Sequence, residues 1–86
     1  MTNKEGKIKQ ILDSLDQLSN DSTIPKNIRK GAQVAKDTLN DANKPLDVRI
    51  ATITMILDEL ANDSNIPIHG RTAVWNIISQ IEFINK

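Results

Sequence analysis

Cysteine is absent from this chain of 86 residues, so disulfides, thiolate catalysis and thiolate metal sites are all excluded. Glycine is scarce, and the three that occur stand alone, so no glycine-rich phosphate-binding loop is present. The sequence also has no Ser-His-Asp arrangement and no His-Glu-x-x-His motif. From these absences we expect a protein that is not an enzyme, with no catalytic residues, no cofactor and no metal ion.

An excess of charge of one sign is also lacking, because 11 basic residues balance 11 acidic residues. No strong field therefore favours nucleic acid or membrane phosphates as partners. No apolar run approaches the roughly 18 residues that a membrane-spanning helix needs. Residues 1–7 lack the apolar stretch of a secretory signal. We expect a cytoplasmic protein that does not bind membranes.

The remaining composition and spacing predict helices. A chain of this length makes one domain, 1–86, with a thin core. Apolar residues recur at three- and four-residue steps in four segments, which is typical of one buried helix face. Clusters of Asn, Asp, Ser and Thr between the segments predict turns, and a proline opens each of the last three helices. The predicted helices are 3–19, 25–40, 45–61 and 67–85.

The sequence repeats itself after 42 residues. Residues 8–35 and 50–77 form 28 aligned pairs with 11 identities, which indicates one supersecondary unit copied once. Two copies are too few for an open solenoid, which needs about three or more. We therefore predict an all-α protein, an antiparallel up-and-down four-helix bundle built from two related helical hairpins.

The predicted core consists of the apolar side chains that recur along these four helices. They are Ile8, Ile11, Leu15, Leu18, Ile28, Ala32, Ala35, Leu39, Leu46, Ile50, Ile53, Leu57, Leu60, Val74, Ile77, Ile81 and Ile84.

Two resemblances follow from short motifs. The stretch Pro45-Leu-Asp-Val-Arg-Ile-Ala51 resembles the signature of HEAT-type helical repeats, shortened by one residue. The whole chain is similar to a small archaeal family, the uncharacterised protein family 0147, through the segments 24–29, 45–49, 56–60, 62–67 and 71–80. This second resemblance implies an archaeal cytosolic origin and a four-helix bundle. It implies no activity, cofactor or active-site residue.

Two pairs of opposite charges flank the first and last turns. Asp16 and Arg29 lie about equally far from the first turn, and Asp58 and Arg71 from the last. In an antiparallel hairpin, equal distance from the turn means equal height. We therefore predict two inter-helix salt bridges with arginine forks. The alternative is an arginine row that binds a phosphate or an acidic partner peptide.

The fourth predicted helix carries apolar residues beyond its inward stripe. Ile68 and Trp75 fall together on a different side, and Phe83 falls on a third. Either neighbouring loops cover these residues, or they form an exposed patch for a protein partner, since tryptophan is a favoured interface residue. Trp75 takes the place of Gln33 in the first copy, so this helix is where the two copies differ most.

The third predicted helix has a second apolar face formed by Val48, Ala51 and Met55. A helix that is apolar on two sides is usually central, so we expect this face to be buried. The alternative is half of a homodimer contact. The candidate protein interface therefore includes Val48 and Met55.

Two weaker site hypotheses remain. The only histidine, His69, lies in the first turn of the fourth helix and has no metal-type spacing to its neighbours. Lys26, Lys30 and Lys36 make the second helix modestly basic and are candidate contacts to RNA, although no aromatic residue stands among them for base stacking. The leading hypothesis is a non-enzymatic interaction or scaffold module with a protein partner or self-association, and an RNA-associated accessory factor is the alternative.

Overall fold

The computed structural model describes the backbone of residues 4–85 and the side chains of residues 6–84. It contains four helices and, within these residues, no strand: α1 (Lys4–Ser19), α2 (Lys26–Leu39), α3 (Leu46–Ala61) and α4 (Ile68–Asn85). The predicted bounds agree to within one residue, except that the predicted start at residue 3 lies outside the described residues. Pro25 and Pro45 take extended conformations just before α2 and α3, as a missing N–H permits.

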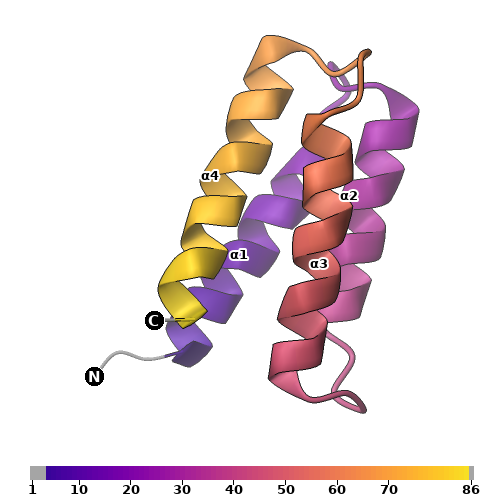
Figure 1. The fold of residues 1–86 in the computed structure, drawn as a ribbon. Coiled ribbons are helices and arrows are strands. Elements are labelled where there is room, and N and C mark those ends of the chain that lie inside the picture. Colours follow the sequence, from indigo (N-terminus) through magenta and orange to yellow (C-terminus); the bar gives the residue numbers. More distant parts are fainter. Residues whose placement is uncertain (1–3, 86) are drawn as a thin grey trace.

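The helices pack in a closed ring. α1 lies against α2, α2 against α3, α3 against α4, and α4 against α1, whereas the backbones of diagonally placed helices do not come close within the described residues. Figure 1 shows successive helices running in opposite directions, with the start of α1 and the end of α4 at the same end of the molecule. The two hairpins therefore close on each other, as the chain length predicted.

The core lies along the axis of this ring. Every predicted core residue is buried except Ile8 and Leu46, which are partly buried against the others. Three further buried hydrophobic residues were not predicted: Ile24, Ala61 and Ile66. Ile24 and Ile66 lie at the ends of the first and last turns, each directly before a proline. A Cβ added at Gly70 would lie 2.8 Å from Ile24 Cδ1, so this glycine lets the first turn approach α4.

The three turns are built alike. Each carries Asn-Asp at its start and Pro at its end. The aspartate carboxylate accepts a hydrogen bond from the N–H two residues later: Asp21 from Thr23 at 2.9 Å, Asp41 from Asn43 at 3.0 Å and Asp63 from Asn65 at 2.7 Å. Such side-chain bonds hold the backbone in a turn, so one local chemistry connects all four helices.

An arginine four residues after each proline donates hydrogen bonds to backbone carbonyls in or near the turn. Arg29 Nε donates to the carbonyl of Ile24 at 3.0 Å. Arg71 Nε reaches back to the carbonyl of Ala61, the last residue of α3, at 3.1 Å. The last carbonyls of a helix have no partner within it, and a guanidinium supplies the missing donor.

Arg49 forms both kinds of bond. Its Nε donates to the carbonyl of Lys44 at 3.0 Å, and its Nη1 donates to that of Leu39, the last residue of α2, at 2.6 Å. The middle turn is therefore tied to the preceding helix as well as to itself.

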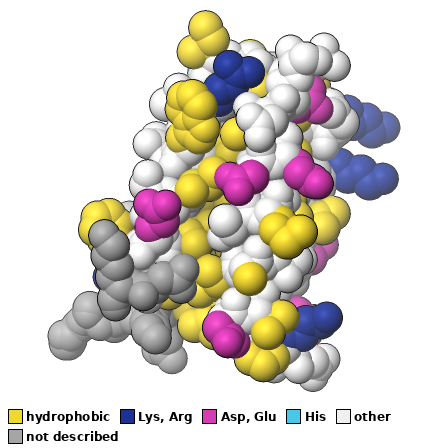
Figure 2. Space-filling view, viewed as in Figure 1, with side chains coloured by type: hydrophobic (Ala, Val, Ile, Leu, Met, Phe, Trp, Pro, Cys, Tyr) yellow, Lys and Arg dark blue, Asp and Glu magenta, His cyan; other side chains and the backbone are white. Residues whose placement is uncertain are grey.

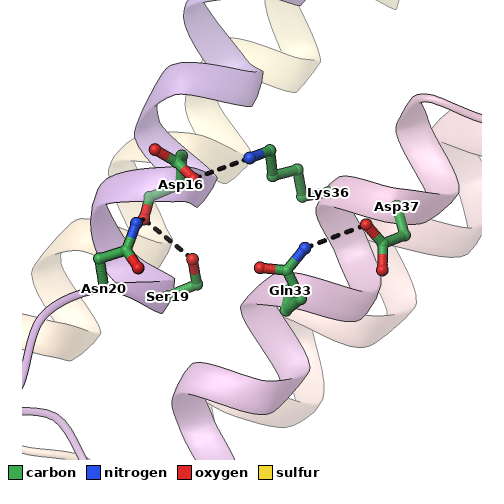
Figure 3. Close-up of polar contacts among 6 residues, drawn as sticks. All are labelled: Asp16, Ser19, Asn20, Gln33, Lys36 and Asp37. Carbon is green, nitrogen blue, oxygen red and sulfur yellow. Dashed lines mark hydrogen bonds and ion pairs between the residues drawn. The ribbon is translucent and has the colours of Figure 1, made fainter.

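The ion pairs differ from the prediction. Lys36 Nζ donates a hydrogen bond to Asp16 Oδ1 at 2.7 Å and forms an ion pair with it across the α1–α2 seam (Figure 3). Among the side chains of residues 6–84, neither the Asp16–Arg29 nor the Asp58–Arg71 pair forms. Arg29 instead donates to the turn carbonyl of Ile24, and Arg71 donates to the last carbonyl of α3, at Ala61.

Candidate functional site on α3 and α4

Four large apolar side chains are exposed on the outer side of the second hairpin. Val48 is 45% exposed and Met55 67% on α3, and Ile68 is 80% exposed and Trp75 56% on α4. On each helix the two lie seven residues apart, which is two turns and therefore one side. We call the surface formed by these residues and Ala51 the α3–α4 face.

The expected burial of the second apolar side of α3 is wrong. Val48, Ala51 and Met55 are all exposed. The reason is the ring arrangement: α3 contacts α2 and α4, and the stripe of Ile50, Ile53 and Leu57 already serves those contacts. The exposure of Trp75 and Ile68 likewise shows that no loop within the described residues covers them.

The face is continuous across the seam between its two helices. In an antiparallel pair of helices, residues equally far from the turn lie at the same height. Met55 is therefore at about the height of Trp75, and Ala51 is at about the height of Ile78. Ile78 is partly buried against the core. Figure 2 shows hydrophobic side chains running down the seam between α4, on the left, and α3, with acidic side chains on both sides.

Phe83 belongs to a different part of the surface. It is 62% exposed, and Lys7 Nζ of α1 lies 5.9 Å from its ring centroid, within the range of a cation–π contact. Lys7, Gln10, Gln80 and Phe83 line a cavity of about 130 Å³ at the α1–α4 seam. Phe83 therefore lies apart from Trp75, as the sequence predicted.

A second cavity of about 270 Å³ lies along the same α1–α4 seam. Its lining includes Ser14, Gln17, Asn76 and Gln80. The side-chain oxygen Oε1 of Gln80 is buried there without a hydrogen-bond partner. The Asp21 carboxylate lies at one end of this lining, beside His69.

His69 has a structural position between α4 and the first turn. Its Nε2 lies 2.8 Å from Thr23 Oγ1 and 3.8 Å from Asp21 Oδ2. The hydrogen bonds that Asp21 accepts from Thr23 side chain and backbone lower the pKa of the Asp21 carboxyl below its ordinary 3.8, and His69 adds to the effect. Within the described residues no cluster of three metal-ligating side chains forms, at His69 or elsewhere.

The candidate RNA contacts are divided by the structure. Lys26 and Lys30 are exposed on α2. Lys36 is partly buried and holds Asp16, so its charge is already paired. The three lysines therefore do not act as one free basic row. In the part of the chain that the structure describes, no helix is long and apolar enough to span a membrane.

Sequence comparison places the chain among archaeal proteins. The model of a family described as "Uncharacterised protein family (UPF0147)" matches residues 1–84. A UPF0147 protein of Thermoplasma acidophilum is 49% identical over 77 residues, covering 90% of this chain and 88% of that protein. One of Methanocaldococcus jannaschii is 45% identical over 69 residues, covering 79% and 73%.

Structure comparison agrees. The crystal structure of a protein of the same family from Thermoplasma acidophilum superposes with a TM-score of 0.90 at 46% sequence identity. The superposition covers 93% of this chain and 94% of the crystallised one.

Proposed function

This chain belongs to the Uncharacterised protein family (UPF0147), and we propose that it works as a non-enzymatic protein-interaction module whose binding surface is the α3–α4 face. The family description carries no activity, so the proposal rests on the surface of the molecule. We also propose the cytoplasm as its compartment.

The observation that carries the proposal is a contrast between equivalent positions of the two hairpins. A shift of 42 residues places small, polar or charged residues of the first hairpin opposite the apolar residues of the α3–α4 face: Gly6 opposite Val48, Lys9 opposite Ala51, Asp13 opposite Met55, Lys26 opposite Ile68 and Gln33 opposite Trp75. The first hairpin folds with these polar positions. Folding therefore does not require the apolar side chains of the second.

We infer further that the two hairpins are copies of one ancestral unit. Ile24 and Ile66, which close equivalent turns, are both buried, and Asp21 and Asp63 accept equivalent backbone hydrogen bonds. Divergence after copying then left one hairpin with a polar outer face and the other with an apolar one.

Exposed apolar residues of this kind support protein binding. Contiguous apolar patches on soluble proteins mark interaction sites, and tryptophan is enriched among the residues that dominate binding energy. Trp75, at 56% exposure, has room to enter a partner's pocket while part of its ring stays packed on the bundle.

Site-specific photo-crosslinking tests the proposal. Benzoylphenylalanine replaces Met55 on the α3–α4 face or, as the control, Val34 on α2, which is 46% exposed. In an extract of the source organism, we expect a discrete adduct at position 55 and none at position 34. Trp75→Ala should reduce the adduct at least tenfold, since interface hot spots contribute about 2 kcal/mol or more.

The outcomes separate the alternatives. An adduct of twice the chain's mass would identify the partner as a second copy and the function as self-association. Equal labelling at positions 34 and 55, or labelling unaffected by Trp75→Ala, would overturn the proposed binding surface.

A further inference from the structure

The balanced total charge conceals a separation between the two hairpins. The described side chains of α3 and α4 include four exposed carboxylates: Asp47, Asp58, Glu59 and Glu82. The two arginines of these helices are partly buried and donate to backbone carbonyls. The exposed lysines of the described residues on helices lie on the first hairpin, at Lys9, Lys26 and Lys30.

The carboxylates lie on both sides of the part of the seam that holds Met55 and Trp75, with Ile68 beyond Asp58 and Glu59. Asp58 and Glu59 follow Met55 by about one turn, toward the last turn of the chain. Asp47 and Glu82 are level with each other at the opposite end, since they are equally far from that turn. The seam between them has Met55 and Trp75 on its sides and Ala51 and Ile78 along it. Figure 2 shows acidic side chains around it and a basic side chain near the upper end of α4.

The size of this surface suits one short helix. On α3, Asp58 follows Asp47 by 11 residue steps, or about 16 Å at 1.5 Å per residue. A partner helix of about three turns has the same length. Two antiparallel helices also present a shallow seam, into which an amphipathic helix places residues at i, i+3, i+4 and i+7.

Building on the proposed function, we propose that the partner of the α3–α4 face is an amphipathic helix with an apolar stripe and Lys or Arg side chains at both ends. The apolar stripe covers Met55, Trp75 and the seam. The basic ends meet the two acidic pairs, which speeds association and fixes the register of the helix. A second copy is a poor match, because the same face would bring carboxylates against carboxylates.

Two synthetic peptides of 18 residues test this chemistry. Both lack tryptophan and carry the same leucine stripe, and one has lysines at its ends where the other has glutamates. Trp75 is the only tryptophan of the protein, so its emission reports binding at the seam. We expect the lysine peptide to shift this emission to the blue in a saturable manner and to bind at least tenfold more tightly than the glutamate peptide.

A matched pair of variants locates the site. Val48 and Val34 are equally exposed, at 45% and 46%, on α3 and α2. Val48→Ser should weaken the lysine peptide at least threefold, and Val34→Ser should leave its affinity unchanged. Glu82→Gln together with Asp47→Asn should reduce the preference for lysine over glutamate severalfold. Circular dichroism of each variant checks that the helices remain.

Each failure has a separate meaning. Equal binding of the two peptides would overturn the proposed preference for a helix with basic ends, and it would leave the protein-binding function standing. If neither peptide shifts the Trp75 emission, or if Val34→Ser weakens binding as much as Val48→Ser, the helix-docking proposal is overturned. The absence of crosslinks at Met55 would instead overturn the proposed function itself.

Discussion

The hairpin of α1 and α2 and the hairpin of α3 and α4 are buried at largely the same positions under the 42-residue shift, but they differ in their outer residues. Leu15 and Leu57 are equivalent by the 42-residue shift and both fully buried. On the outside, Gln33 donates to Asp37 at 3.0 Å on α2 (Figure 3), whereas the equivalent of Gln33 on α4 is the exposed Trp75. At this position the first hairpin has a polar side chain that bonds to a neighbour on the same helix, and the second has an apolar one.

This difference separates the requirements of folding from those of binding. Inner positions are constrained by close packing, where even small volume changes are costly. Outer positions tolerate most substitutions within about 0.5 kcal/mol. The first hairpin has one such exposed apolar residue, Val34, whereas the second has Val48, Met55, Ile68 and Trp75 together. A cluster of this kind on only one hairpin has no explanation in folding, and the comparison can be tested position by position.

The largest effect is expected in the core. Leu15→Ala and Leu57→Ala should each lower the free energy of unfolding by about 2–5 kcal/mol, because each leaves a cavity. Urea denaturation followed by circular dichroism measures both. Similar losses would support equivalent hairpin cores, and a loss below about 1 kcal/mol in either variant would contradict them.

The arginine hydrogen bonds come next. Arg71→Met keeps the aliphatic packing and leaves the Ala61 carbonyl without its donor, so we expect a loss of about 1.5–3 kcal/mol, typical of a hydrogen bond to a charged group. Arg49→Met removes two such bonds and should cost more. An unchanged melting temperature for Arg71→Met would refute this role.

A smaller effect is expected from the ion pair that only the first hairpin has. Lys36 and Asp16 are 28% and 48% exposed, and the residue equivalent to Lys36 is the partly buried Ile78. A double-mutant cycle with Lys36→Met and Asp16→Asn should give a coupling of about 0.2–1 kcal/mol. Added salt should reduce it, and a coupling insensitive to salt would contradict the assignment.

The smallest effect is a pH dependence at the first turn. The pKa of Asp21 is lowered in the folded state, chiefly by its hydrogen bonds from Thr23. The stabilisation is therefore present above the ordinary pKa of 3.8 and is lost as the pH falls through the lower folded value. Urea denaturation at a series of pH values measures how the free energy of unfolding falls in acid. Thr23→Val should make this fall, the acid limb of the curve, less steep. The same acid limb in Thr23→Val and the wild type would contradict it.

Periodicity and punctuation predicted the helices and nearly all of the core. Apolar spacing fixes which side of a helix is buried, and the three prolines mark where α2, α3 and α4 begin. Ile24 and Ile66 were missed because each stands alone before a proline, outside any helical stripe. Their burial depends on how the turns fold back on the helices, which a single segment cannot reveal.

The candidate site was predicted in part. The sequence identified Ile68, Trp75, Phe83, Val48 and Met55 as possible surface residues, but their exposure depended on which helices are neighbours. The salt bridges failed for a different reason. Equal height brings Asp16 and Arg29 to one level, yet it ignores backbone carbonyls that compete for the guanidinium: that of Ile24 in the turn for Arg29 and that of Ala61 at the end of α3 for Arg71.

The ring arrangement has a consequence for how quickly the chain folds. Three of its four helix contacts join helices that follow each other along the chain, and only the α1–α4 seam joins distant segments. Topologies dominated by such local contacts fold in microseconds to milliseconds. The transition state should then contain the turns and their flanking helices, with substitutions at the α1–α4 seam changing the unfolding rate far more than the folding rate.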